Sequence, residues 1–361
     1  MTTLLDGHRA AELAAACDVL DGLSCSDLQS VLTLMSERRA HQVSARSVLA
    51  GNRFHQPAEV SQRRFHEVEA VIFNTLEDIE FVELSPVQPF GINTVLADIS
   101  AKNVVSALRG CEVNADATTA LFRLALARHE SGADPVRLAA NVRTVRAQVF
   151  DPGSKLLPHF KVFAQVSVGQ HGPHYGDAEL RALARHLICE LAVLRAVFDA
   201  FAVADTRLDV SIGNVLFSRE LAEAGVIDVP RTGHAIRAVT DIPERLPFGA
   251  EDLGGTLRDL GFTRGVKVTE LFRDIIAADA PELMPRLSLD LRRRYGVGYY
   301  QHVCYKIAAF HPVVGRVPLA DGGTTNWPQT VLGHRRMFCA ASGVGTELLC
   351  RHLIGDEGVT R

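Results

Sequence analysis

The hydrophobic positions along the chain change period several times, and each change predicts an element. Apolar residues recur three and four apart from 64 to 79 and again from 177 to about 203, which predicts amphipathic helices. Alternation of apolar and polar residues predicts two strands at 137–146 and 160–168, joined by a turn-rich loop at 151–155. The same kind of pattern predicts shorter strands, at 81–86, 209–217, 299–307 and 337–342.

Two regions depart from this mixture of helices and strands. Residues 5 to about 60 are typical of helices, and the second helix is predicted to begin at Ser26, where Ser26 to Gln29 has the spacing of a capping box. The stretch from the end of the predicted strand at 209–217 to about 285 is mostly helical and loop-like, and Pro230, Pro243 and Pro247 interrupt it. We therefore divide the chain into four parts: a helical N-terminal extension at 1–62, the first part of a core at 63–200, an insertion at 201–285 and the last part of the core at 286–361.

Composition narrows the class of protein. With 361 residues, 47% of them hydrophobic and 22% charged, the chain can bury one large core or two moderate ones and is expected to be soluble. A formal charge of −4 gives no overall electrostatic reason to bind a nucleic acid. No apolar stretch reaches the roughly 18 residues of a membrane span. The seven cysteines are scattered among apolar neighbours without a Cys-x-x-Cys pair, so we expect a reducing, cytoplasmic location.

Polar residues at the start of a predicted helix form the first candidate site. Asp116 and Thr118 can cap the helix that follows, which leaves its N-terminal amides available to an anion or carboxylate. A purely structural cap explains these residues equally well. His171 and His174 stand three apart in a Gly/Pro loop, but neither a cysteine nor a carboxylate lies at ligand spacing, so we expect loop polarity rather than a metal site.

Glycines mark the last part of the chain. Asp321, Gly322 and Gly323 predict a turn after a short strand. Gly343 and Gly345 stand where the strand at 337–342 is predicted to meet the last helix, and two glycines at such a position allow close approach of a nucleotide base or phosphate.

The order of these segments resembles the core of the class II aminoacyl-tRNA synthetases, most closely histidyl-tRNA synthetase and its paralogue, the regulatory subunit of ATP phosphoribosyltransferase. A helix and strand ending at Pro86 resemble the first family motif, the strands around 151–155 the second, and Gly343-Val344-Gly345 the third. The paired Tyr299-Tyr300 resembles the histidine-recognition segment. The resemblance implies an α+β fold with a mixed, mainly antiparallel sheet flanked by helices, and a homodimer.

The resemblance also implies roles for individual residues. Arg146 takes the place of the arginine that holds the α-phosphate of ATP and the carboxylate of the amino acid, a task suited to a planar guanidinium. The implied substrate-binding residues are Asp116, Thr118, Gln165, Tyr299 and Tyr300. The implied residues for ATP with Mg²⁺ are Arg146, Gly322, Gly323, Gly343, Gly345 and Glu347.

Several positions depart from the family pattern. Leu348 stands where an arginine contacts the γ-phosphate of ATP, and Gly169 and Gly298 stand where the family has acidic residues. These changes suggest a ligand other than histidine. Because the chain ends at Arg361, soon after the third motif, we do not expect it to charge tRNA.

Two hypotheses follow. In the first, the protein binds an amino acid or related carboxylate and activates it with ATP, as a ligase in small-molecule biosynthesis. In the second, it has lost ATP chemistry and acts as an amino-acid-binding regulatory subunit that associates with a catalytic partner protein. The lost arginine at Leu348 favours the second hypothesis, and the retained Arg146 fits either.

Overall fold

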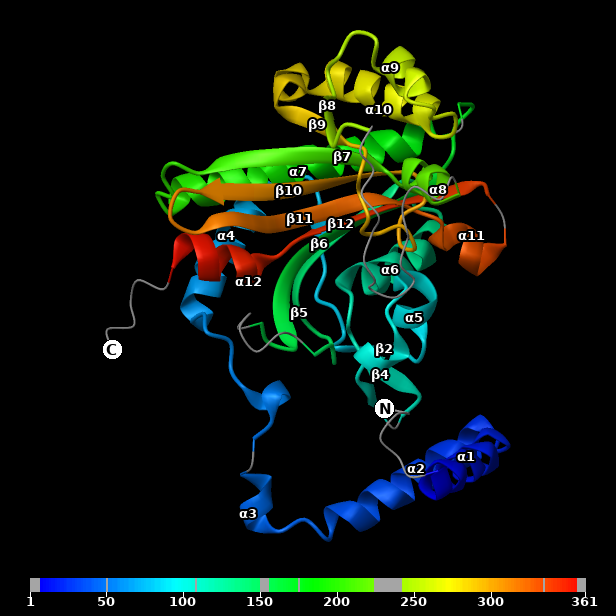
Figure 1. Cartoon of the computed structure of the whole chain (residues 1–361). Coiled ribbons are helices and arrows are strands. Elements are labelled where there is room, and N and C mark those ends of the chain that lie inside the picture. The colour runs from blue at the N-terminus through cyan, green and yellow to red at the C-terminus, as the bar shows by residue number, and fades with distance from the viewer. Residues whose placement is uncertain are drawn as a thin grey trace.

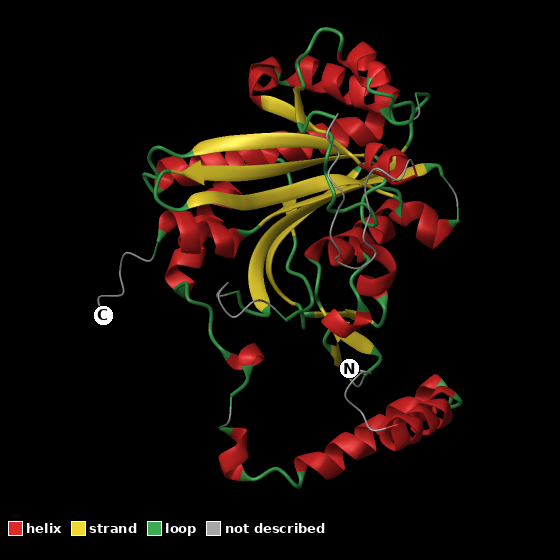
Figure 2. Cartoon of the chain, in the orientation of Figure 1, coloured by secondary structure: helices red, strands yellow, loops and turns green. Residues whose placement is uncertain are grey.

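One nine-stranded β-sheet forms the centre of the protein (Figures 1 and 2). The computed structural model describes residues 7–49, 51–107, 109–149, 156–174, 176–223, 242–333 and 335–355. The sheet has the order β1-β5-β6-β12-β11-β10-β7-β9-β8, and only the β1–β5 and β7–β9 pairs within it are parallel. The predicted α+β fold with a mainly antiparallel sheet is confirmed. The loop predicted at 151–155 and the break predicted at Pro230 lie outside the described residues.

The strands are short at the edges of the sheet and long in its middle. The strands of the large sheet are β1 Glu80–Phe81, β5 Val136–Val145, β6 His159–Gln170, β7 Arg207–Asn214, β8 Arg245–Pro247, β9 Leu287–Asp290, β10 Val303–His311, β11 Gly315–Thr325 and β12 Met337–Val344. A separate antiparallel sheet has the order β2-β4-β3, with β2 Val87–Pro89, β3 Ser106–Ala107 and β4 Cys111–Val113.

Helices cover both faces of the large sheet. The helices that the structure describes, including three in the N-terminal extension that do not cover the sheet, are α1 Gly7–Asp21, α2 Cys25–Ala40, α3 Ala45–Val48, α4 Gln62–Thr75, α5 Ile92–Ala97, α6 Ala117–Glu130, α7 Asp177–Ala200, α8 Val215–Glu223, α9 Leu253–Asp259, α10 Val266–Asp279, α11 Trp327–Leu332 and α12 Thr346–Leu349. Short 3-10 or π-helical turns lie at Arg53–His55, Ala101–Asn103, Pro281–Arg286 and Cys350–Ile354.

The core has two hydrophobic layers because the central strands are buried on both faces. On one face, α4, α7 and α10 contribute Ile72, Leu187 and Phe272 to the larger layer. On the other face, α6 contributes Leu121 to a smaller layer. Trp327 at the start of α11 completes the smaller layer and contacts the ring of Phe122 edge-on. Beside α6, this second face of the sheet is only partly covered and borders a cleft.

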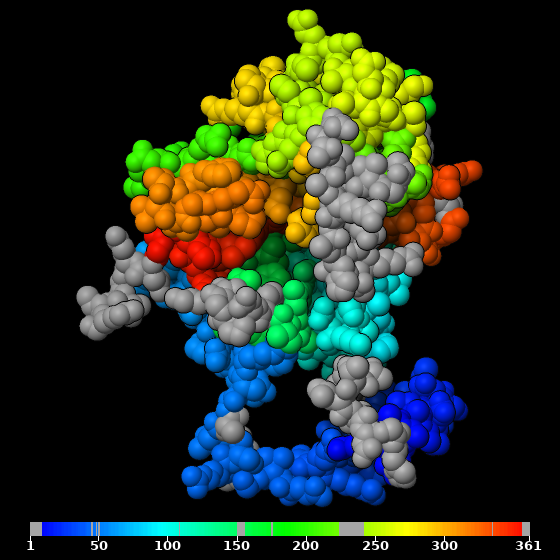
Figure 3. Space-filling view, in the orientation of Figure 1, coloured from blue at the N-terminus to red at the C-terminus, as the bar shows by residue number. Residues whose placement is uncertain are grey.

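The predicted N-terminal helices are present and stand apart from the body of the protein, as the space-filling view shows in blue (Figure 3). No described residue of α2 is buried. The segment after α3 returns to the body, where the Arg53 guanidinium donates to the carbonyl groups of Ala147 and Gln148. The extension is therefore attached to the strand-loop-strand segment of the core.

Three local predictions are wrong. Helix α2 is capped by Ser24, which accepts a hydrogen bond from the Asp27 amide at 3.1 Å, and not by Ser26. Tyr299 and Tyr300 lie in a turn before β10, because both of their amides bond to the Gly296 carbonyl. Gly322 and Gly323 lie inside β11 and not in a turn.

The two strand glycines make room for large neighbours on opposite faces of the sheet. A methyl group at Gly322 would lie 2.5 Å from Tyr305 Cζ, and one at Gly323 would overlap the Tyr300 ring. The glycines are therefore needed for packing rather than for a turn.

The range 201–285 contains one central strand as well as helices. Strand β7 pairs with β10 in antiparallel register and with β9 in parallel register. The helical part of this range, with α8, α9 and α10, thus follows β7, and α10 packs against the larger hydrophobic layer.

Candidate functional site

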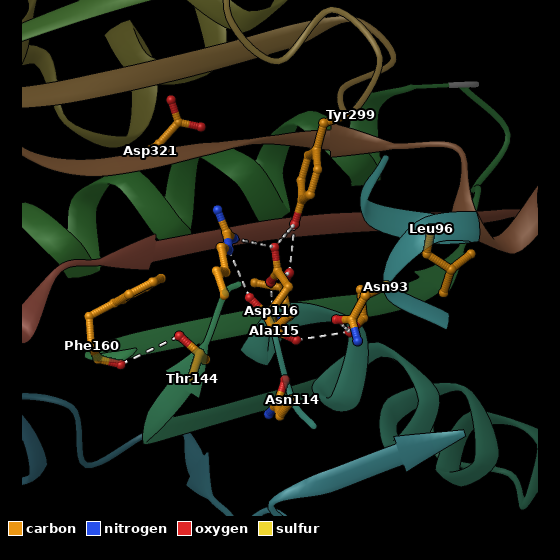
Figure 4. Close-up of polar contacts among 12 residues, drawn as sticks. Asn93, Leu96, Asn114, Ala115, Asp116, Thr144, Phe160, Tyr299 and Asp321 are labelled. Atoms are coloured by element: carbon orange, nitrogen blue, oxygen red, sulfur yellow. Dashed lines mark hydrogen bonds and ion pairs between the residues drawn. The ribbon is translucent and has the colours of Figure 1, made fainter. Parts of the chain in front are cut away.

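A cleft of about 1500 Å³ lies on the open face of the large sheet. Its floor is formed by strand residues that include Ala164, Ala341 and Gly343. Its walls are the start of α6 on one side and residues 294–300, hereafter the tyrosine turn, on the other. The close-up in Figure 4 shows that the side chains of Asp116, from the α6 side, and Tyr299, from the turn, point toward one another.

Asp116 organises the α6 side of the cleft. Its Oδ1 accepts hydrogen bonds from the Thr118 amide at 3.0 Å and from the Thr118 hydroxyl, so it caps α6 as the sequence predicts. Its Oδ2 lies 3.4 Å from the Arg146 guanidinium. The Thr118 hydroxyl also lies 2.6 Å from the Tyr299 hydroxyl, which closes a polar network between two walls of the cleft.

Arg146 follows β5 and lies against this network. Its Nε donates to the Ala115 carbonyl at 2.9 Å, and its guanidinium lies over the Phe160 ring. The Arg146 side chain is 32% exposed. A guanidinium carries five N–H donors, so Arg146 retains donors for a ligand in the cleft after these contacts are made.

The tyrosine turn is held by a second charged network. The Arg293 guanidinium, which is buried, donates to Asp321 Oδ2 at 2.7 Å, and the Tyr300 hydroxyl donates to Asp321 Oδ1. Burial, together with the Asp321 carboxylate, raises the pKa of Tyr300 well above its usual range. Burial and the Asp116 carboxylate do the same for the pKa of Tyr299. Both hydroxyls therefore stay protonated.

A second lobe of about 400 Å³ continues along the same face of the sheet. It shares Arg146, Phe160 and Gly343 with the first cleft and extends over Gly345 and Leu348. Glu347 lies in its wall, but its Oε2 already accepts from Arg143 at 2.8 Å and from the Lys161 amide at 3.1 Å.

Most of the sequence-predicted site residues line the cleft or the second lobe. Five of them line the cleft itself: Asp116, Thr118, Arg146, Tyr299 and Tyr300. Gly343, Gly345 and Glu347 line the second lobe. Gly323 lies beneath Tyr300, and Gly322 lies beneath Tyr305.

Gln165 does not reach the cleft. Its side chain is fully buried on the α7 side of the sheet, where Nε2 donates to the His186 carbonyl at 3.2 Å. Neighbouring Ala164, on the same strand, faces the cleft instead. Successive residues of a strand point to opposite faces, so Gln165 is directed away from any ligand on the cleft floor.

Sequence reasoning missed three contributors to the site. Asp98, which follows α5, lines the cleft. Arg293 and Asp321 form the network behind the tyrosine turn. Asp321 was considered only as a turn residue, and the run of basic residues at 292–294 carries no signal that one of them is buried beneath the cleft.

Nothing in the part of the chain that the structure describes is suited to hold a metal by itself: no three or more His, Cys, Asp and Glu side chains are grouped as a candidate metal site. Of the helices that the structure describes, none combines the length and apolarity that a membrane span requires.

Solved structures provide the comparison that decides the fold. A protein from Bacillus halodurans described as an ATP phosphoribosyltransferase regulatory subunit/histidyl-tRNA synthetase is 16% identical to this chain, with 85% of this chain and 84% of that chain covered and a TM-score of 0.60. This protein has a class II synthetase-like core. Histidyl-tRNA synthetase from Nostoc sp. is 15% identical, over 83% of this chain and 73% of its own, with a TM-score of 0.55.

A histidine–tRNA ligase subunit from Alicyclobacillus acidocaldarius gives a similar result, at 15% identity, with 82% of this chain and 94% of that chain covered and a TM-score of 0.54. No protein-family model matches the sequence, and no curated protein matches it. The class II synthetase-like core thus rests on the arrangement of the chain in space, and the cleft lies on the open face of its sheet.

Proposed function

We propose that the protein binds an amino acid or related carboxylic acid in the cleft and activates it with ATP bound in the second lobe. The observation that carries this proposal is the position of Arg146, which lines both the cleft and the second lobe. A guanidinium between two connected sites can contact the carboxylate of one ligand and a phosphate of the other at once.

In the proposed reaction, a carboxylate oxygen of the acid attacks the α-phosphorus of ATP. The bond between the α-phosphorus and the bridging oxygen of the β-phosphate breaks, and pyrophosphate leaves. Arg146 would offset the negative charge that concentrates at the α-phosphate, and the walls of the cleft would hold the two ligands in line.

The residues present fit ATP better than they fit a resident metal. Gly343 and Gly345 add no side chain to the second lobe, and Leu348 and Phe160 give it apolar surface for a base. The carboxylates of that lobe are Glu347, whose Oε2 is bound to Arg143, and Asp321, which is bound to Arg293. We therefore propose that Mg²⁺ would be held mainly by the nucleotide phosphates, as is usual for this ion.

A second function is favoured by one specific observation. Leu348 lines the second lobe at the sequence position where the resemblance implies an arginine for the γ-phosphate, although Lys161, Lys306 and Arg351 also line this lobe. The solved structure from Bacillus halodurans is described as an ATP phosphoribosyltransferase regulatory subunit/histidyl-tRNA synthetase. The alternative is therefore a regulatory role, in which an amino acid bound in the cleft changes the activity of a catalytic partner protein.

Pyrophosphate exchange across a panel of amino acids and other carboxylic acids tests the proposal. At least one acid is expected to support exchange, and Arg146→Ala is expected to slow it by about 100-fold, the usual cost of removing one charge-stabilising donor. Arg258→Ala is the matched control, because Arg258 pairs with Glu270 on the surface, away from the cleft.

The outcomes separate the two functions. If no acid supports exchange and calorimetry detects no ATP binding, activation is excluded and the regulatory alternative remains. That alternative in turn fails if a pull-down recovers no catalytic partner and the purified protein turns over alone. Unchanged exchange in Arg146→Ala would show that Arg146 has another role. The homodimer and the cytoplasmic location stay predictions.

A further inference from the structure

Asp98 is an acidic residue in the cleft wall whose carboxylate has no partner among the residues that the structure describes. It is the C-cap of α5, and it lines the cleft together with the residues of the tyrosine turn. No hydrogen bond or ion pair joins its carboxylate to any other described residue. The other two acids of the cleft differ, since Asp116 lies beside Arg146 and Asp321 is held by Arg293.

The backbone of Asp98 is in an unfavourable conformation. Its φ of 51° and ψ of 28° are left-handed, which costs a residue other than glycine about 1 kcal/mol or more, although aspartate tolerates this region better than most. Such a conformation persists only where the surrounding structure enforces it. Contacts at both ends of α5 provide that enforcement.

The first contact is at the start of α5. The buried Glu112 carboxylate accepts from the Gly91 amide at 2.8 Å and from the Asn93 amide at 2.9 Å. The second contact is two residues before Asp98, where the buried Trp327 Nε1 donates to the Leu96 carbonyl at 2.6 Å. Figure 4 shows Leu96 and Asn93 on this short helix beside the Asp116 network. The helix is thus fixed at both ends.

The position of the Asp98 carboxylate also depends on Gly298. A methyl group at residue 298 would overlap Asp98 Oδ2, so the carboxylate lies directly over the backbone of the tyrosine turn. Tyr299 lines the same cleft, as does Tyr295, whose ring centre lies 5.5 Å from Lys306 Nζ. A carboxylate attracts a cationic group, and an aromatic ring in the same cleft can add to that attraction.

Besides Arg146, two arginines line the cleft and carry the charge that could pair with Asp98. The Arg219 guanidinium donates to the Val297 carbonyl at 3.2 Å and so supports the tyrosine turn. Arg294 is exposed on the turn itself. Neither forms an ion pair with Asp98 among the described residues, which leaves the Asp98 carboxylate open to the cleft.

We propose that Asp98 is a specificity-determining residue that binds a positively charged side chain of the ligand. This inference rests on the proposed function and deepens it: the acid bound in the cleft is an amino acid whose side chain carries an amine or guanidine. Arg146 would contact the carboxylate of this ligand, and Asp98 would contact its far, cationic end.

Calorimetric binding without ATP tests this inference, with matched pairs of ligands: lysine against norleucine, and arginine against citrulline. The wild-type protein is expected to bind the charged member of at least one pair at least about tenfold more tightly, the usual effect of one charged hydrogen bond. Asp98→Asn is expected to abolish this preference, because asparagine keeps the size and tolerates the left-handed backbone but lacks the charge.

Two further variants make the test specific. Gly298→Ala is expected to reduce the same preference, since its methyl group displaces the Asp98 carboxylate without removing any charge. Asp205→Asn is the matched control, because Asp205 also has a left-handed φ, of 54°, but lies in the exposed turn between α7 and β7. It is expected to leave binding unchanged.

The inference is overturned if norleucine and citrulline bind as tightly as their charged partners, if Asp98→Asn keeps the preference, or if no cationic ligand binds. The result is separable from the proposed activation. Charge-selective binding that Asp98→Asn removes, without pyrophosphate exchange for any acid, would reject activation and retain the role of Asp98. Exchange with neutral acids that Asp98→Asn does not alter would do the reverse.

Discussion

Glu190 makes the stability of the protein depend on pH in a way that one substitution can isolate. It lies on α7, fully buried against the sheet, where its Oε2 accepts from the Tyr305 hydroxyl at 2.8 Å. Its Oε1 and the nearby Gln165 Oε1 have no hydrogen-bond partner among the described residues. Burial raises the pKa of Glu190 from 4.5 to about 8, so the carboxyl group is neutral in the folded protein near pH 7.

The sign and size of the effect follow from this shift. Between about pH 4.5 and 8 the folded protein holds a proton that the unfolded chain releases, so stability is present at low pH and is lost as the pH rises. Each pH unit in this window costs about 1.4 kcal/mol. From about pH 5 to pH 8, Glu190 therefore lowers the free energy of unfolding by about 4 kcal/mol.

Glu190→Gln should remove this dependence. Glutamine has nearly the same shape as glutamic acid, and its oxygen can accept from the Tyr305 hydroxyl. Its amide nitrogen also supplies a donor near Gln165 Oε1, which has no partner among the described residues. The variant is expected to match the wild type within about 1 kcal/mol near pH 5 and to be about 4 kcal/mol more stable near pH 8.

Guanidinium unfolding followed by circular dichroism at a series of pH values measures the difference between the two proteins. Glu251→Gln is the control, since Glu251 is exposed and should give curves parallel to the wild type. A difference between Glu190→Gln and the wild type that does not change with pH would refute the reasoning, because it would mean that Glu190 is ionised in the folded protein.

Two other substitutions test the packing between α7 and the sheet. Burial, and the nearby Arg137 and Arg185, lower the pKa of His186 from 6.5 to about 3, so its contribution to stability is present above about pH 6.5 and is lost as the pH falls. His186→Gln should therefore lower the midpoint pH of acid unfolding. An unchanged midpoint would show that His186 is not the group whose protonation unfolds the protein. Gly322→Ala should destabilise the protein by about 1–3 kcal/mol in denaturant unfolding, because its methyl group would lie 2.5 Å from Tyr305 Cζ and 2.6 Å from Ser342 Cβ. Gly172→Ala, with no atom within 4 Å of its added methyl group, is the control, and equal effects of the two substitutions would exclude crowding as the cause.

The sequence predicted the features that depend on local pattern. The paired strands β5 and β6, the cap at Asp116 and the strand that leads to Gly345 follow from periodicity and from residues with strong positional preferences. These features were enough to suggest the fold. The resemblance added the position of Arg146, which the structure places in the cleft.

The sequence did not predict which side chains of a strand buried on both faces point to the cleft and which point to α7. Strand β6 is buried on both faces, so alternation does not tell that Gln165 faces α7 while Ala164 faces the cleft. For the same reason, Gly322 and Gly323 look like a turn until Tyr305 and Tyr300 are seen to fill the space beside them. Asp98 was missed because its neighbour in the cleft, Gly298, lies 200 positions further along the chain.

The order of strands in the sheet has a consequence for synthesis of the chain. Strand β6 pairs with β12 from Phe163 to Gln170, and the hydrogen bond from the Phe163 amide to Thr346 joins residues 183 positions apart. While the ribosome makes the intervening segment, the β5–β6 hairpin has an apolar edge without a partner, which is a template for association with other chains. A polypeptide interrupted before Met337 would therefore be a substrate for chaperones or proteases rather than a half-active fragment.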